Sequence, residues 1–356
     1  MASTLSTTPL CLRFEAWPEI DRQAWNQSIN SDDPFDDDDH YGATLAHDTL
    51  TALRKGYGRW LAFLATKAWL DTAAAPLARV TVPRLRAYLR HLLRQRNAAA
   101  TIEGRFCHLT MAMKMLAPGF DVSWIRKPDG VTVRALLPRH QKPVRVPPCE
   151  VLLDWGLRMM AVARRTPDSM VQLLMFRDGL LITMLATRAR RRKSMSLLTL
   201  GTEIYKVDEA YRIDLTAKQT KNKKQDRFDL PITLTAEIDT YLKHIRPKLM
   251  RGQNHSSLWV SQTGGPLTMK GLTERIFVLS RKEFGYAFGP HAFRHAVSTM
   301  LAEHDPSNTG LAAGVLNITP QVDSRHYNRA KQIAACNRFA ELIEGKRRAY
   351  GTGGRS

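Results

Sequence analysis

The chain has 356 residues, which is too long for one ordinary hydrophobic core, so we expect two domains. Its net charge of +20 and its isoelectric point of about 10.1 predict a polyanionic partner, most simply nucleic acid. Residues 1–40 hold nine acidic and two basic side chains, so the rest of the chain carries about +27. The sequence shows neither a sustained apolar run nor a basic-then-apolar N-terminus, so we expect a cytoplasmic protein with no membrane association.

The acidic N-terminal segment and the cysteines do not predict a metal site. Four consecutive aspartates, Asp36–Asp39, precede His40, but like charges repel each other and such runs are usually solvated. We therefore expect residues 1–43 to be a flexible acidic arm. The cysteines lack CxxC spacing and a histidine at zinc-ligand spacing, which predicts reduced thiols at Cys11, Cys107, Cys149 and Cys336.

Residues 44–127 have the apolar spacing of a small helical bundle. One helix is expected through Leu50–Leu64, and a second begins at Pro83, because proline is favoured in a first helical turn. A third helix starts near residue 100 and ends before Pro118. Basic side chains lie at the rims of this predicted bundle.

The stretch 128–148 is basic and rich in proline, and its apolar residues follow no sustained period. Two interpretations remain open. It is either an extended linker between two domains, which would let the chain wrap a duplex, or a surface loop.

The second half alternates helices with short strands, which predicts an α+β domain over residues 149–345. The second of its helices is expected to be capped by Thr166-Pro167-Asp168 and to run into a basic segment, 186–200. The expected strands are Glu203–Val207, Arg212–Leu215 and Arg227–Leu230, and the expected helices are Leu152–Ala163, 171–185, Arg192–Leu198, Ala236–Ile245 and Lys270–Lys282.

A polar triplet stands out in the stretch 289–330. His291, Arg294 and His295 lie at i, i+3 and i+4, so a helix would place them on one face. Phe293 and Val297 fall on another face and are expected to be buried, together with Met300 and Leu301. An arginine fork beside two imidazoles suits a bound phosphate, because arginine grips two oxygens and histidine can transfer a proton.

The HxxRH pattern, followed by Tyr327 in the sequence RHYNRA, resembles the catalytic box of the tyrosine recombinase (phage integrase) family. The resemblance implies a mostly α-helical fold with a small antiparallel β-sheet. It implies a helical-bundle DNA-binding domain, here 44–127, and an α+β catalytic domain, here 149–345. Residues 346–356 are expected to form a flexible basic tail. Tyr327 would be the nucleophile of the family.

The resemblance also implies an arginine after an apolar helix and a lysine on a β-hairpin. Alignment on Ser196-Leu197 assigns the catalytic arginine to Arg190, and the other nearby candidates are Arg188, Arg191, Arg192 and Lys193. The family's lysine often stands in a TKN-like sequence, which indicates Lys221, while Lys218 and Lys223 remain alternatives because hairpin register is hard to read from sequence. The other basic residues nearby are expected to contact DNA phosphates; they are Arg188, Arg191, Arg192, Lys218, Lys223 and Lys224.

One position departs from the family pattern. About ten residues before the tyrosine the family usually has histidine or tryptophan, whereas this chain has Asn317. An asparagine amide can donate a hydrogen bond to phosphate but cannot shuttle a proton. We therefore keep Asn317 among the expected site residues and expect the change to affect efficiency more than the type of reaction.

The resemblance implies cleavage of double-stranded DNA through a 3′-phosphotyrosine, with no metal or cofactor, in a prokaryotic, nucleoid-associated protein. Such enzymes integrate or excise mobile elements, act as tetramers on DNA, and in some cases need companion recombinases. The predicted last helix, 333–343, would dock on a neighbouring protomer or on its own domain. Two alternatives remain: an enzyme like the type IB topoisomerases, and a DNA-binding protein derived from a recombinase, which Asn317 favours.

Overall fold

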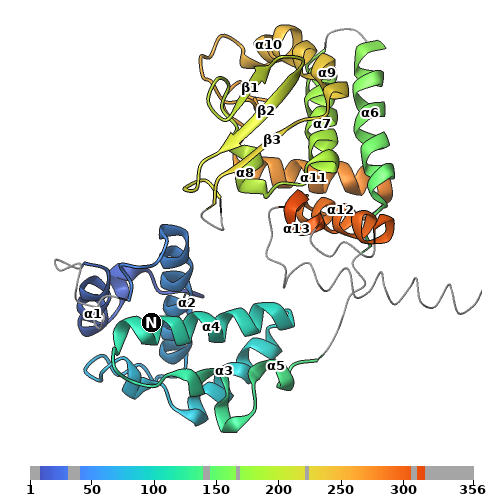
Figure 1. Cartoon of the computed structure of the whole chain (residues 1–356). Helices are drawn as coiled ribbons and strands as arrows, with labels where there is room; N and C mark the ends of the chain where they lie inside the picture. The colour runs from blue at the N-terminus through green and yellow to red at the C-terminus, as the bar shows by residue number, and fades with distance from the viewer. Residues whose placement is uncertain are drawn as a thin grey trace, which may run out of the picture. The chain divides into compact units, whose positions relative to one another are not determined.

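The computed structural model divides the chain into two compact units, Met1–Pro143 and Val144–Ser356 (Figure 1). Each unit has its own hydrophobic core. The predicted fold class is confirmed: the described residues are mostly helical, with one small antiparallel sheet. The structure describes residues 9–30, 41–138, 145–165, 169–220, 224–305 and 311–316.

The first unit is a helical bundle, as the sequence predicts. Helix α3 begins with a proline in its first turn, and the Thr81 hydroxyl accepts a hydrogen bond from the Arg84 amide (3.4 Å). Trp60, Tyr88 and Phe106 are buried together in the core of the unit. The helices are α1 (Glu19–Ile29), α2 (His47–Thr66), α3 (Val82–Arg94), α4 (Ala99–Leu116) and α5 (Val133–Leu136).

The N-terminal segment differs from the flexible arm that we expected over residues 1–43. Within it, 19–29 form helix α1, and the side chain of Trp25 is 3% exposed. The buried carboxylate of Asp21 pairs with Arg79 and accepts a hydrogen bond from the Tyr57 hydroxyl (2.9 Å). The acidic run 31–40 lies outside the described residues. The helix is held because its one aromatic side chain, Trp25, and its one buried acid, Asp21, complete the core of the bundle.

The segment 128–148 also differs in part from both the linker and the loop that we expected. The helix α5 lies inside it, and the Thr132 hydroxyl caps α5 by accepting from the Ala135 amide (3.3 Å). Val133 and Leu137 are buried in the core of the first unit, which explains why this stretch packs rather than extends. Residues 139–144 lie outside the described ranges.

The second unit is built around helix α7 (Met170–Thr187), which packs along α6 (Cys149–Arg165) (Figure 1). Ser169 caps α7 by accepting a hydrogen bond from the Gln172 amide; the Thr-Pro-Asp sequence expected to cap it lies outside the described residues. Contrary to our expectation, α7 is long and apolar enough to cross a membrane, but most of it is buried inside this unit. We therefore identify α7 as the core helix of this unit.

The three predicted strands pair in the order β1-β2-β3 (Figure 1), and their buried apolar residues belong to the same hydrophobic core as those of α7. They are β1 (Ile204–Val207), β2 (Ala210–Leu215) and β3 (Asp226–Asp229). The pair Leu215–Asp226 closes the β2–β3 hairpin, so the lysine-rich loop starts and ends at this pair. The position of this pair therefore determines where the lysine-rich loop leaves the sheet.

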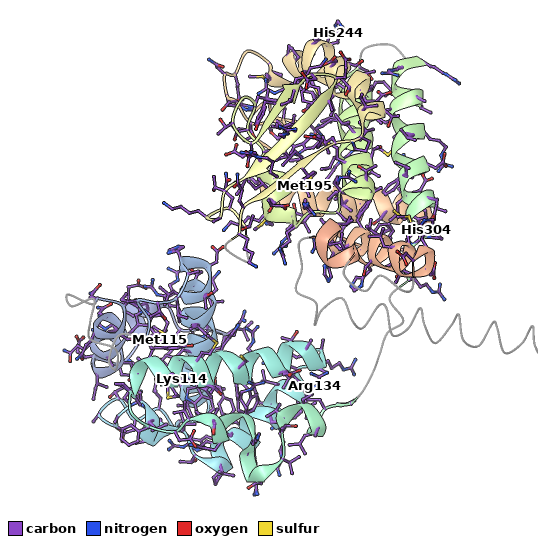
Figure 2. All side chains as sticks on the ribbon, viewed as in Figure 1. Lys114, Met115, Arg134, Met195, His244 and His304 are labelled. Atoms are coloured by element: carbon purple, nitrogen blue, oxygen red, sulfur yellow. The ribbon has the colours of Figure 1, made fainter. Side chains whose placement is uncertain are left out.

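Helices complete the second unit around this sheet and α7. The predicted helix 236–245 is α9 (Thr235–Thr240), continued by a π-helical turn (Tyr241–Ile245) into α10 (Arg246–Met250). Figure 2 shows Met195 on α8 and His304 at the end of α12. The remaining helices are α8 (Arg192–Ser196), α11 (Met269–Phe284), α12 (Pro290–His304) and α13 (Leu311–Leu316).

A buried ionic cluster fixes α7 to its neighbours. The Arg177 guanidinium donates to Asp178 and to the Val260 carbonyl oxygen (2.6 Å). Asp178 also accepts from Nε of Arg275 on α11 (2.6 Å). Because both Arg177 and Asp178 are almost fully buried, this cluster fixes the orientation of α7 about its own axis.

The helices α6 and α7 approach most closely at two glycines, Gly156 and Gly179. A Cβ atom on Gly179 would lie 2.7 Å from the carbonyl oxygen of Gly156, and a Cβ atom on Gly156 would lie 2.3 Å from the hydroxyl of Thr183. These distances are too short for any side chain. The two backbones can therefore pack this closely only with glycine at both positions.

We expect Gly179→Ala to lower the free energy of unfolding by about 1–3 kcal/mol, because overpacking at the helix crossing exceeds the gain in helix propensity. The matched change Gly104→Ala in α4 meets no atom within 4 Å and is expected to raise stability by up to about 1 kcal/mol. Urea unfolding followed by circular dichroism measures both. Equal shifts in the two variants would contradict the close packing of α6 on α7.

Candidate active site

Helix α12 carries the polar triplet that the sequence predicts. Gly289 precedes it and Pro290 lies in its first turn. Phe293 and Val297 are buried, with 0% and 2% exposed, as expected from the helical period. The rings of His291 and His295 stack edge to face with centroids 4.6 Å apart, so the helix does bring the two imidazoles together.

The segment after α7 brings a second arginine to the same place. Helix α7 ends at Thr187, and the short stretch before α8 directs Arg190 inward beneath the sheet. Ala189 is fully buried, and its carbonyl oxygen accepts a hydrogen bond from Nη1 of Arg294 on α12 (2.5 Å). Residues 105 positions apart in the sequence are thereby joined. The ends of α7 and α12 form one site.

The Arg190 side chain is held on three sides. Its Nη2 donates to Oδ1 of Asp226 (2.8 Å), and its Nε lies 2.8 Å from Oδ2 of the same carboxylate, within ion-pair distance although its N–H points away from a hydrogen-bond direction. The guanidinium carbon lies 4.2 Å from the ring centroid of Phe228, which covers one face. The third side, Nη1, donates to the carbonyl oxygen of Val315.

Arg294 has a similar environment. Besides the Ala189 carbonyl, it donates from Nη2 to the carbonyl oxygen of Leu316 (2.8 Å). The two carbonyl groups at the end of α13 thus accept hydrogen bonds from both arginines. A helix C-terminus carries partial negative charge, so α13 presents to Arg190 and Arg294 the kind of acceptor that a phosphate oxygen would be.

The pocket concentrates positive charge away from water. Arg190 and Arg294 are 6% and 7% exposed. Burial, with Arg191 and Arg190 as neighbours, lowers the pKa of Arg294 to about 10, which leaves it charged at neutral pH. Burial likewise lowers the pKa of Arg190, with Asp226 opposing the shift. One carboxylate faces two buried guanidinium groups, so the site favours an anion.

His295 is half-buried on the same helix face. Burial, and secondarily the charge of Arg294, lowers the pKa of His295 below its ordinary value. The imidazole is therefore neutral near pH 7 and able to accept a proton. His291, one turn earlier, is exposed.

The expected DNA-contacting residues that the structure describes differ in burial. Arg188 and Arg191 are partly buried, whereas Arg192, Lys218 and Lys224 are exposed. Burial also lowers the pKa of Arg191. Of the remaining expected site residues, the structure does not describe Lys221, Lys223, Asn317 or Tyr327. Leu316 is the residue before Asn317, so the chain enters its undescribed part directly at the two arginines.

Sequence reasoning missed Asp226 and Phe228, which hold Arg190. The carboxylate is the first residue of a strand and reads in the sequence as one more acid beside a lysine-rich loop. Only the hairpin register, with Asp226 opposite Leu215, would have placed it under the sheet. Among the described residues, no group of three or more histidine, cysteine, aspartate or glutamate side chains could hold a metal ion.

Comparisons with solved structures identify the fold. The XerH site-specific recombinase bound to palindromic difH substrate, a post-cleavage complex, superposes with a TM-score of 0.56 and 14% identity, covering 91% of this chain and 95% of that one. The XerH pre-cleavage complex with difH gives a TM-score of 0.52 and 17% identity, covering 80% and 78%. This chain has the tyrosine recombinase fold.

The likeness in fold confirms the resemblance to the tyrosine recombinase family that the HxxRH pattern and the sequence RHYNRA indicate. No protein-family model and no curated protein sequence matches the chain. Both described segments that carry arginines in the site, the stretch between α7 and α8 and helix α12, belong to the unit that follows the helical bundle. At identities of 14% and 17%, the likeness to XerH shows the fold alone. The chemistry has to be argued from the residues of the site.

Proposed function

We propose that this chain is a site-specific DNA recombinase or integrase that cleaves and rejoins duplex DNA through a 3′-phosphotyrosine, in the integration or excision of a mobile element. The observation that supports the proposal best is the convergence of Arg190 and Arg294. Both guanidinium groups are nearly buried, and both donate to the carbonyl end of α13. Burial of two guanidinium groups beside a single carboxylate is costly unless an anion uses them.

In the proposed reaction the Tyr327 oxygen forms a bond to the scissile phosphorus, and the bond from phosphorus to the 5′-oxygen breaks. Arg190 and Arg294 hold the non-bridging oxygens and offset the charge that develops there, taking up phosphate oxygens in place of the α13 carbonyls. Lys221 gives its proton to the leaving 5′-oxygen, with Lys218 and Lys223 as alternatives. The energy of the broken bond is kept in the phosphotyrosine.

The two histidines and Asn317 complete the proposed site. His295 takes the tyrosine proton, which its lowered pKa favours because the imidazole is neutral near pH 7. His291 binds a phosphate oxygen or positions Arg294, since it stacks on His295 one helical turn away. Asn317 donates an amide hydrogen bond where the family has a ring. The 5′-hydroxyl of a partner strand then attacks the phosphotyrosine and releases Tyr327.

We further propose that the enzyme acts in the cytoplasm on nucleoid DNA, as a tetramer with exchange of its C-terminal helix, and with companion recombinases where its element encodes them. The first unit would also bind the duplex. Arg188, Arg191, Arg192, Lys218, Lys223 and Lys224 would contact DNA phosphates.

Binding of duplex DNA is expected to weaken by about 10³-fold or more between roughly 50 and 200 mM salt, as for proteins with about six to ten phosphate contacts. The reason is that each contact releases counterions from the DNA. Fluorescence anisotropy with a labelled duplex measures the slope of log affinity against log salt. A flat slope would remove the argument from the net charge of +20.

The function is tested with nicked duplexes drawn from the ends of the element that encodes the chain. The protein is incubated with them in EDTA, and a denaturing gel separates covalent protein–DNA adducts. We expect an adduct. Tight binding without an adduct, even with companion recombinases added, would instead indicate a DNA-binding protein derived from a recombinase. Relaxation of supercoiled plasmid without strand exchange would indicate topoisomerase-like activity.

A further inference from the structure

We propose that Asp226 is a positioning residue for Arg190: it fixes the Nε and Nη2 side of the guanidinium so that the Nη1 side is presented to the scissile phosphate. This inference rests on the proposed function, because it assigns the role of a residue in the same site. Asp226 would act through Arg190 without contacting the DNA.

The geometry of the guanidinium carries the proposal. Both carboxylate oxygens of Asp226 lie 2.8 Å from one edge of Arg190, one from Nη2 and the other from Nε. The Phe228 ring covers a face of the same group at 4.2 Å. With one edge and one face occupied, the fork cannot rotate, and the Nη1 edge points at the Val315 carbonyl oxygen. That carbonyl is the acceptor that a phosphate oxygen can replace.

The place of Asp226 in the sheet gives it a second link to the site. It pairs with Leu215 at the base of the β2–β3 hairpin, directly after the loop that contains Lys221. The described ends of that loop make two hydrogen bonds: the Thr220 hydroxyl donates to the Lys224 carbonyl (2.6 Å), and the Gln219 amide donates to Glu203, just before β1 (2.7 Å). The ion pair therefore ties the root of the lysine loop to the buried arginine.

A carboxylate is suited to this position because of the charges around it. Arg190, Arg191 and Arg294 influence one another electrostatically, and Asp226 opposes the lowering of the pKa of all three. Without Asp226, two nearly buried guanidinium groups would repel each other, and Arg190 would turn toward solvent. The acid therefore both orients Arg190 and permits it to stay beside Arg294.

We expect Asp226→Ala to slow covalent adduct formation by about 10- to 100-fold under single-turnover conditions, as for a small misplacement of a catalytic group. Binding of the duplex is expected to change less than about threefold, since phosphate contacts elsewhere dominate affinity. Asp226→Asn keeps the shape and one acceptor oxygen, so an intermediate rate is expected. The matched control is Asp229→Ala, which removes an exposed acid of the same strand that pairs with Arg212.

A second substrate separates positioning from a purely structural role. A methylphosphonate at the scissile position replaces one non-bridging oxygen by a methyl group and removes its negative charge. If Asp226 acts through the grip of Arg190 on that charge, the deficits of Asp226→Ala and Arg190→Ala should both shrink on this substrate. A variant that is merely misfolded would show the same fractional deficit on phosphate and methylphosphonate, because less active protein slows both reactions equally.

The outcomes are distinct. A slow Asp226→Ala whose deficit shrinks on methylphosphonate together with that of Arg190→Ala supports the proposal. An unchanged rate, or equal deficits on the two substrates, overturns it while wild-type adduct formation still supports the recombinase function. If the wild type forms no adduct under any condition, the proposed function has failed and the role of Asp226 falls with it.

Discussion

Replacing Tyr327 with phenylalanine is expected to abolish covalent DNA capture and to leave duplex binding within about twofold of wild type, because binding is governed by phosphate contacts elsewhere. The variant keeps the ring and loses only the hydroxyl oxygen that would bond to phosphorus. Phenylalanine has no oxygen that could bond to phosphorus, so the loss should be complete rather than partial. Nicked duplexes and a denaturing gel measure capture, and fluorescence anisotropy measures binding.

The control for this substitution is Tyr286→Phe. Tyr286 belongs to the same unit and packs with the rings of Phe284 and Phe288, so the same chemical change is made away from the site. It should form the adduct at the wild-type rate. An adduct that persists in Tyr327→Phe would show that another residue is the nucleophile. The match to the family pattern that assigns roles to Lys221 and Asn317 would then have to be revised.

Arg294→Ala is expected to lower the single-turnover rate of capture by about 10²–10³-fold, as when a preorganised donor to a developing oxyanion is removed. Arg294 is 7% exposed, and its two donors already point at oxygen atoms, those of Ala189 and Leu316. Arg294→Lys should recover only part of the rate, because an ammonium group keeps the charge but cannot form the planar two-point contact.

The control for Arg294 is Arg158→Ala on α6, which removes an exposed arginine that pairs with Asp154 and Glu283. Surface ion pairs contribute at most about 1 kcal/mol, so neither the fold nor capture should change much. Melting temperatures of all three variants establish that the rates compare folded proteins. Wild-type capture by Arg294→Ala would contradict the assignment of the buried pocket as the phosphate site.

The sequence predicts the arrangement of the triplet well because the helical period alone determines which side chains are neighbours. Once residues 290–304 form a helix, the spacing of His291 and His295 dictates that their rings meet, and Phe293 must face the core. Many elements of both units are equally local in origin. Proline in a first turn and alternating strands predict α3 and β2 to within a few residues.

The contacts that build the pocket are not local, and sequence alone could not supply them. Arg190 stands in a run of basic residues that are chemically alike. Alignment to the family selects it, but its burial, which separates it from the exposed Arg192, appears only in the structure. Its partner Asp226 lies 36 residues away on another element. The carbonyl acceptors of α13 have no side-chain signal at all, because any residue carries a backbone oxygen.

The buried pair of Asp21 and Arg79 sets a limit on how the first unit can be cut from the chain. Arg79 is 1% exposed, and Asp21 is the charged partner that it has among the described residues. A fragment beginning at residue 44 would leave that guanidinium buried without a counter-charge and the Tyr57 hydroxyl without its acceptor, a loss of about 3–5 kcal/mol. An isolated first unit should therefore begin before Trp17, whose ring packs on both Trp25 and Tyr57.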